Sequence, residues 1–365
     1  MAANVKINRA LLPLAWIYGA GVWIRNQLFD RKILPVEEFS ISVISIGNLA
    51  VGGTGKTPHT EYLIRLLSKK YKVAVLSRGY RRKTKGFVLA DENASSQILG
   101  DEPFQMFRKF PHIWVAVDSD RRRGIRNLLN LSEKPEVILL DDAFQHRWVK
   151  PSLSILLSDF RRPFDKDELL PAGRLREPAK NAARADIVIS TCHSALGAES
   201  PVYGIAGQAC NDKQILQTSF RYKSLLPLFP EKSTVQKESI ERLKKEAYSF
   251  LLVAGLARPQ DMVEYIEKYT TDLHSIIYPD HHPFARKDID TITDTFNHIQ
   301  NKNKRIITSE KDAVRLIGNP YLSEEIKPFL YYLPIEVVFR PEQETIFTQK
   351  IEDHVRNFKR NRILA

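Results

Sequence analysis

Several residue types that bind phosphate lie close together in the stretch SVISIGNLAVGGTGKTP, residues 42–58. Glycine has no Cβ, so backbone N–H groups in a glycine-rich loop can turn toward an anion. Lys56 can reach the outer phosphates of a nucleoside triphosphate, and the Thr57 hydroxyl can ligate Mg²⁺. The stretch is therefore typical of a phosphate-binding P-loop. The residues that we expect at the phosphates are Ala50, Val51, Gly52, Gly53, Thr54, Gly55, Lys56 and Thr57.

The match departs from the usual pattern at one position, because Ala50 stands where the first glycine is expected. The alternative is an ordinary glycine-rich turn between a strand and a helix. We favour the P-loop because an apolar strand precedes the loop and a helix-like segment follows from Pro58. Proline is tolerated in a first helical turn, where its missing N–H is not needed.

A second signal is EVILLDDAFQ, residues 136–145, in which an apolar strand ends in Asp141 and Asp142. This is the Walker B arrangement, whose acid holds Mg²⁺ opposite the P-loop threonine. Gln145 and His146 extend the same loop. Further along, LPAGRLREP (170–178) is a loop that carries Arg176 and Glu177. Beside a phosphate and Mg²⁺ these two side chains would bind them, Glu177 as a metal ligand; elsewhere they would form an ordinary polar turn.

Other candidate residues lie in loops after apolar strands, where open α/β sheets bind ligands. The loop SRGYRRKTKG (77–86) surrounds Tyr80 with cations and could bind a substrate phosphate or simply be a solvated basic loop. Arg121 is a candidate phosphate contact or the start of a solvated helix. Asp101 and Glu102 lie in a Gly–Pro-bounded turn. His281, in the turn PDHHP (279–283), could be a metal ligand, a loop histidine that pairs with a carboxylate, or part of an exposed polar turn.

The elements that must position these residues read as α/β. Six short apolar strands with helical spacers predict a mostly parallel, doubly wound sheet of the P-loop NTPase type, and a smaller α/β lobe follows. We expect an interfacial segment at 1–35, the P-loop core at 36–200, a hinge and second lobe at 201–345, and a terminal segment at 346–365 with a basic helix at 350–362.

Residues 10–24, ALLPLAWIYGAGVWI, carry no charge and are flanked by arginines. Fifteen residues are short for a helix that spans a bilayer, which needs about 20. A signal peptide lacks a convincing cleavage site here. A buried first helix is one remaining alternative. We favour an interfacial segment, because Trp16, Tyr18 and Trp23 suit the headgroup region and the arginines suit anionic lipid.

The 365-residue chain has a formal net charge of +12, which implies an anionic partner. Nucleic acid, an anionic membrane surface and a phosphorylated substrate all meet that description. No nucleic-acid motif is recognisable, so we expect no nucleic-acid partner. Two cysteines suggest neither a disulfide framework nor a cysteine metal site, and they favour a reducing compartment. No obligate protein partner is evident.

Together these stretches resemble one family over nearly the whole chain, the tetraacyldisaccharide 4′-kinases. The resemblance rests on LPLAWIYG, SIGNLAVGGTGKTP, SRGYRR, GDEP, DDAFQHR, LPAGRLREP, VAGLARP, PDHHPF and TSEKDAVR, in family order. The family tolerates a residue other than glycine at the position of Ala50. Ala143 stands where many members have glycine, which is a mild departure.

The resemblance implies a peripheral kinase on the cytoplasmic face of the inner membrane, in lipid A biosynthesis. It would transfer the γ-phosphate of ATP to the 4′-hydroxyl of a lipid disaccharide 1-phosphate. It implies that Asp101 and His281 pair as the base for that hydroxyl. Lys56, Thr57, Asp141 and Asp142 would hold ATP and Mg²⁺. The remaining candidates, with roles left open, are Tyr80, Glu102, Arg121, Gln145, His146, Arg176 and Glu177.

One alternative function belongs to another class. A membrane-associated P-loop NTPase could act as a switch that positions a partner, without phosphorylating an acceptor. Such a switch needs a group that positions water but no pair that activates a hydroxyl, so the roles of Asp101 and His281 distinguish the two functions.

Overall fold

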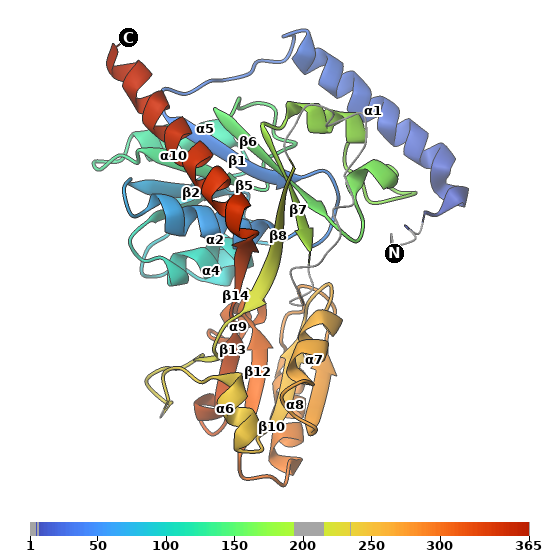
Figure 1. The fold of residues 1–365 in the computed structure, drawn as a ribbon, viewed down its shortest axis with the longest axis vertical. Helices are drawn as coiled ribbons and strands as arrows, with labels where there is room; N and C mark the ends of the chain where they lie inside the picture. Colours follow the sequence, from blue (N-terminus) through green and yellow to red (C-terminus); the bar gives the residue numbers. More distant parts are fainter. Residues whose placement is uncertain (1–4, 6, 193–214, 234, 365) are drawn as a thin grey trace. The chain divides into compact units, whose positions relative to one another are not determined.

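The computed structural model describes residues 5, 7–192, 215–233 and 235–364. The chain forms two compact units (Figure 1). The first consists of residues 1–219 and 337–365, and the second of residues 220–336. The second lobe was expected to begin at residue 201, but β8 extends the first unit's sheet. The hinge was expected within 201–245, and residues 201–214 of that segment lie outside the described residues.

The first unit is built on a sheet with the order β14-β8-β7-β6-β1-β5-β2-β4-β3. Strands β8, β7, β6, β1, β5, β2 and β4 run parallel to one another, and β3 pairs antiparallel with β4. The bounds are β1 (Ser42–Asn48), β2 (Val73–Ser77), β3 (Val88–Leu89), β4 (Trp114–Val117), β5 (Val137–Asp141), β6 (Leu153–Asp159), β7 (Ile187–Cys192), β8 (Ile215–Tyr222) and β14 (Ile335–Phe339).

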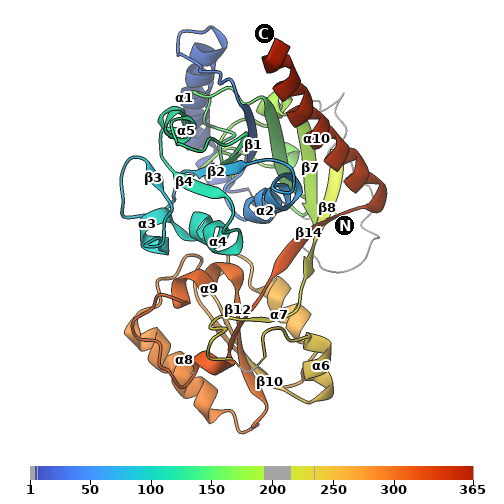
Figure 2. The ribbon, with the colours of Figure 1, turned by 90° about the vertical axis from the view of Figure 1, so that its left-hand side faces the viewer.

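Helices pack on both faces of this sheet, which confirms the predicted doubly wound α/β fold. Side chains of a strand alternate between its faces, and one set packs with Ile125 and Leu128 of α5. Helices α2 and α10 contact β1 and lie together in Figure 2. The helices of the unit are α1 (Leu12–Asp30), α2 (Lys56–Leu67), α3 (Ser96–Leu99), α4 (Asp101–Lys109), α5 (Arg121–Leu129) and α10 (Pro341–Leu364).

The second unit is a smaller α/β layer, with the strand order β11-β10-β12-β13-β9. Its strands are parallel except β9. They are β9 (Leu226–Pro227), β10 (Ser249–Ala254), β11 (Leu273–Ile277), β12 (Lys304–Ser309) and β13 (Leu330–Leu333), and the helices are α6 (Ile240–Lys245), α7 (Gln260–Ile266), α8 (Arg286–His298) and α9 (Glu310–Leu316).

The C-terminal helix returns to the first unit. α10 begins at Pro341, earlier than the expected basic helix, and Phe347 packs against Tyr62 of α2 with 5.9 Å between ring centroids. Burial raises the pKa of Tyr62 to about 12, and its hydroxyl lies 2.9 Å from Glu344. α10 therefore covers the helix that starts at the P-loop lysine.

The apolar N-terminal segment forms a single helix, α1, with large side chains left in solvent. Trp16 is 70% exposed and Ile17 72%, and Trp23 and Ile24 are about half exposed. Among the described residues, no helix has both the length and the apolar character needed to cross a membrane. The buried-helix alternative fits poorly, because most apolar side chains of α1 are not covered.

Candidate active site

The P-loop is the turn between β1 and α2. β1 ends at Asn48, and α2 begins at Lys56 with Gly55 as its N-cap. Gly52 has φ +111° and Gly55 φ +82°, conformations that a side chain would strain. Glycines therefore stand where the loop needs positive φ. The turn leaves the first N–H groups of α2 directed at the space beyond the end of β1.

The P-loop is braced from both sides. The amide of Asn48 donates to the Thr54 hydroxyl at 2.8 Å. Ala50 forms an antiparallel bridge with Leu175, and the Val51 N–H donates to the Arg174 carbonyl at 2.8 Å. Ala50, the residue that replaces the usual glycine, thus forms a β-bridge with the 170–178 loop, and such a bridge tolerates alanine.

The two acids after β5 occupy different environments. The Asp141 carboxylate accepts from Thr60 at 3.1 Å and from Ser77 at 3.4 Å, and it is almost fully buried. Burial and repulsion from Asp142 raise the pKa of Asp141 to about 6. Asp142 has φ +47° and is about one third exposed. Its carboxylate lies 3.7 Å from Lys56 and 3.0 Å from Arg176.

These cations determine the charge of Asp142. Burial acts to raise the pKa of Asp142, but Lys56, Arg176 and Arg121 outweigh it, so the pKa is lowered. Asp142 is therefore ionised beside the P-loop lysine. Glu102, in the first turn of α4, adds to the negative charge that acts on Asp141.

This donor set fits Mg²⁺, which takes one or two carboxylates and completes its octahedron with water and phosphate oxygens. Thr57 lies in the first turn of α2, and Asp141 is the last residue of β5, a parallel neighbour of β1, with Asp142 directly after it. Within the described part of the chain, no group of three or more His, Cys, Asp or Glu side chains could hold a metal by itself. A metal here would need the nucleotide's oxygens as ligands.

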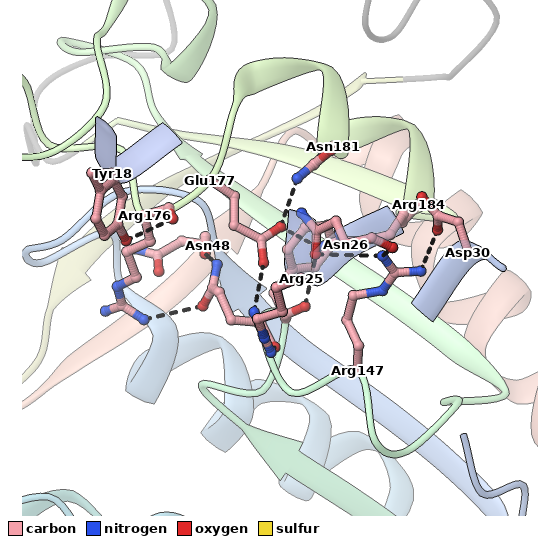
Figure 3. A network of polar contacts seen from close by, with 12 residues as sticks. Tyr18, Arg25, Asn26, Asp30, Asn48, Arg147, Arg176, Glu177, Asn181 and Arg184 are labelled. Atoms are coloured by element: carbon pink, nitrogen blue, oxygen red, sulfur yellow. Dashed lines mark hydrogen bonds and ion pairs between the residues drawn. The ribbon is translucent and has the colours of Figure 1, made fainter. Parts of the chain in front are cut away.

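Glu177 is surrounded by nitrogen donors (Figure 3). The side chain is 1% exposed. One oxygen accepts from Asn181 at 2.8 Å and from Arg184 at 2.6 Å, and the other lies 3.6 Å from Arg25 of α1. Glu177 as a metal ligand stays a prediction; in this structure its charge is matched by two arginines.

Arg176 and Gln145 connect this group to the P-loop site. Arg176 donates to the side-chain oxygen of Gln145 at 3.2 Å, and the Gln145 amide donates to the Asn48 carbonyl at 2.7 Å. Helix α1 contacts this group as well. The Tyr18 hydroxyl donates to the Arg176 carbonyl at 2.9 Å (Figure 3). Arg25 donates to the Gln145 carbonyl at 2.6 Å.

Sequence reasoning missed these supporting residues. Arg25 was read only as a flank for lipid, and Tyr18 as a headgroup contact. Thr60 and Asn48 carried no signal beyond their places in the helix and strand. The contacts join residues 120 and 158 positions apart, so only the fold reveals them.

Arg121 and His146 lie beside the acids. Arg121 is 2% exposed and donates to the Asp118 carbonyl at 3.1 Å and to the Asp141 carbonyl at 3.5 Å. Burial lowers the pKa of Arg121 to about 10, and burial followed by Arg121 lowers the pKa of His146 to about 4. His146 is therefore neutral at pH 7. Within the described residues, Arg121 Nε and His146 Nε2 are buried without a hydrogen bond.

Asp101, expected in a turn, begins helix α4, and Tyr80 lies on the neighbouring loop after β2. Asp101 is the first residue of α4, where a carboxylate favours the positive end of the helix dipole. Tyr80 is 56% exposed, with the Arg81 guanidinium 5.6 Å from its ring centroid.

His281 belongs to the second unit and has φ +59°. Lys311 Nζ lies 2.8 Å from Nε2, and an Arg315 nitrogen lies 3.4 Å from Nδ1. Buried Asp312 holds Arg315 at 2.8 Å and accepts from the Gly255 N–H at 2.9 Å. The neighbouring His282 pairs with Asp288 at 2.9 Å and stacks on Tyr278. The PDHHP turn is thus an ordered part of the second unit.

Comparisons with known proteins identify the family of this chain. The family model for tetraacyldisaccharide-1-P 4′-kinase matches residues 7–355. Tetraacyldisaccharide 4′-kinases of Phocaeicola vulgatus and Bacteroides thetaiotaomicron are each 48% identical, and the alignments cover 98% of this chain and 98% and 96% of theirs. A crystal structure of LpxK from Aquifex aeolicus in complex with ATP superposes with a TM-score of 0.73 at 29% identity, covering 95% of this chain and 99% of that one. The chain therefore belongs to the tetraacyldisaccharide 4′-kinase family.

Proposed function

We propose that this protein transfers the γ-phosphate of ATP to the 4′-hydroxyl of tetraacyldisaccharide 1-phosphate, a step of lipid A biosynthesis. The observation that carries the proposal is the contact of ionised Asp142 with Lys56 and Arg176 beside a P-loop. A phosphoryl group in transfer carries spread negative charge, and catalysis comes mostly from positioning and neutralising it. Family membership supplies the acceptor.

In this function the nucleotide is held by the residues of the P-loop site. Backbone N–H groups of residues 52–57 would face the phosphates, since the Val51 N–H already donates to the Arg174 carbonyl, and Lys56 would neutralise the outer phosphates. Thr57, Asp141 and Asp142 would hold Mg²⁺, which would supply positive charge to the phosphates. Lys56, now 3.7 Å from Asp142, is placed to neutralise the transferred phosphate as well.

We further propose that Asp101 and His281 accept the proton of the attacking hydroxyl. The ring of His281 lies between two side chains of α9, with Lys311 Nζ 2.8 Å from Nε2 and an Arg315 nitrogen 3.4 Å from Nδ1, and these contacts orient the imidazole. Asp101, in the first unit, would supply a negative charge that stabilises the protonated imidazole. Asp101 and His281 would then act together as one base.

The membrane surface is the third part of the proposal. Helix α1 exposes Trp16, Ile17, Trp23 and Ile24, and aromatic side chains favour the headgroup region of a bilayer. The acceptor is a lipid, so a peripheral enzyme on the cytoplasmic face of the inner membrane would meet it there. The positive charge of the chain favours an anionic surface.

The decisive experiment measures transfer of labelled γ-phosphate to purified tetraacyldisaccharide 1-phosphate. We expect acceptor-dependent transfer, and we expect Asp101→Ala and His281→Ala each to lower kcat far more than they raise the KM for ATP. His298→Ala, on the exposed end of α8, is the control and should be near wild type. ATP hydrolysis at one rate with or without acceptor, and no labelled product, would instead favour a switch-like NTPase.

A further inference from the structure

The loop that follows β2 forms a pocket of about 450 Å³ in the first unit. The volume suits a small charged group together with part of a sugar. Four of the lining residues are cationic, and none of the described lining residues is acidic. The lining consists of Arg78, Gly79, Tyr80, Arg81, Arg82, Thr84, Lys85, Gly86 and Ser119.

The pocket is held in shape by its own hydrogen bonds. Arg82 donates to the Gly86 carbonyl at 2.6 Å and to the Val117 carbonyl at 3.4 Å. Thr84 donates to the Ile98 carbonyl at 2.6 Å. Burial lowers the pKa of Arg82, which shows that its charge is partly withdrawn from water. A cation in that position gains more from an anionic ligand than a solvated one does.

The acid next to the lining residue Ser119 has a partner outside the pocket. Asp118 is fully buried and forms a two-pronged pair with Arg123, at 2.8 and 2.7 Å. Arg123 does not line the pocket, although Asp118 also acts on the lining residue Arg82.

The pocket adjoins the residue that we propose as part of the base. Gly100, which precedes Asp101, has φ +93°, and a Cβ there would lie 2.9 Å from the Tyr80 carbonyl and 3.3 Å from Gly79 Cα. Gly79 has φ +69° and equally little room, 2.8 Å to the Leu99 carbonyl. The two backbone segments are therefore packed directly against each other.

The acceptor of this family carries a 1-phosphate. We propose that the pocket binds that phosphate. Arginine and lysine form strong charge-assisted hydrogen bonds with phosphate oxygens. With its phosphate in the pocket and its hydroxyl near Asp101, the disaccharide would be oriented at two points, which lowers the entropy cost of reaction. The inference rests on the proposed kinase function and adds the group that selects the acceptor.

The test compares two acceptors: tetraacyldisaccharide 1-phosphate and the same lipid without the phosphate, both dispersed in neutral detergent. The measured quantity is the ratio of their kcat/KM values. We expect the double variant Arg81→Gln, Lys85→Gln to lower kcat/KM for the phosphorylated acceptor by about a hundredfold, roughly tenfold for each lost charge-assisted bond. Transfer to the acceptor without phosphate should stay near the wild-type rate.

Lys83→Gln is the matched control. Lys83 is an exposed cation of the same loop that donates to Gln97 at 2.9 Å and does not line the pocket, so this variant should keep the wild-type ratio. Arg81→Lys should recover part of the lost ratio, since it restores the charge without the planar fork. Circular dichroism and ATP binding of the double variant should match wild type.

Three results would overturn the inference: an equal loss with both acceptors, no loss with either, or a loss in the Lys83 variant as large as in the double variant. A second experiment, binding to phosphatidylglycerol vesicles, tests whether the pocket instead binds the phosphate of a membrane lipid. If the double variant lost binding to phosphatidylglycerol vesicles while its acceptor ratio stayed wild type, the pocket would serve lipid headgroups instead. Absence of transfer to both acceptors in wild type would contradict the proposed function itself.

Discussion

The P-loop site of the first unit and the His281 turn of the second hold their side chains by opposite arrangements of charge. In the first, an ionised acid, Asp142, lies among cations from α2 and the 170–178 loop. In the second, an imidazole lies beside two cations from one helix, α9. A buried acid, Asp312, fixes Arg315 there. The first arrangement prepares a place for phosphate and metal, while the second fixes the orientation of an imidazole.

Loss of the P-loop cation should give the largest effect. Lys56→Ala should lower kcat by about a thousandfold, because a preorganised charge on the transferring group is lost. It should also leave Asp142 with one cation fewer. Labelled-phosphate transfer measures the effect, and Lys69→Ala, an exposed lysine after the same helix, is the control. Near-wild-type transfer by the Lys56 variant would contradict the role of the P-loop cation.

The next largest effect, on stability rather than on kcat, should follow the loss of the buried acid Asp312 in the second unit. Asp312→Asn leaves Arg315 buried without its carboxylate, and breaking a buried pair costs about 3–5 kcal/mol. Urea denaturation measures the free energy of unfolding, with Asp290→Asn on the exposed face of α8 as control. Unchanged stability would mean that Asp312 does not organise the His281 turn.

The two acids after β5 should differ in their response to pH. The pKa of Asp141 is raised to about 6, so between about pH 4 and 6 the folded protein keeps a proton that the unfolded chain releases. Its contribution to stability is complete below about pH 4 and is lost as pH rises to 6, on the order of 3 kcal/mol. The difference in unfolding free energy between wild type and Asp141→Asn, measured from pH 4 to 7, should change by that amount.

The control for this titration is Asp91→Asn, an exposed acid in a loop, which should show no such window. A flat difference for Asp141 would mean that the carboxyl is not destabilised by burial and by Asp142. The pH window should disappear when Mg²⁺ and ATP are bound, because a metal favours the ionised carboxylate.

The smallest expected effect is at the outer edge of the P-loop site. Tyr18→Phe removes one hydrogen bond to the Arg176 carbonyl and should cost about 1 kcal/mol of stability, with kcat lowered less than about tenfold. Tyr321→Phe, a half-exposed tyrosine of the second unit, should change neither quantity. A large loss of kcat at Tyr18 would extend the functional part of the P-loop site into α1.

The sequence was most informative where function and local structure coincide. The glycines at 52 and 55 and the acids after β5 act through their own turns, so local patterns predict both the elements and the chemistry. The apolar runs that became β1, β2, β4, β5, β6 and β7 were visible for the same reason. The fold class and the P-loop turn were therefore predictable.

Residues whose role depends on packing were not predictable. β8 alternates covered and partly covered side chains and reads as a mixed segment, and β14 follows a whole second unit before it returns to the sheet. Arg25 contacts Gln145 across 120 positions of sequence. Lys311 and Arg315 belong to a motif that was noted, but nothing in its spacing indicates that both would meet His281.

The polar anchoring of α1 fixes how that helix is turned about its own axis. Tyr18 and Arg25 are seven residues apart, so they share one side of α1. Tyr18 contacts Arg176 (Figure 3), and Arg25 contacts Gln145. Trp16 and Trp23 are also seven apart, and a two-residue offset sets them roughly 200° around the helix. The side of α1 that carries Trp16 and Trp23 therefore has a fixed orientation relative to the P-loop. On a bilayer, α1 would hold the protein in one orientation. Adding one residue between Tyr18 and Trp23 would rotate the following part of the helix by about 100°, so that lipid and ATP would no longer be aligned.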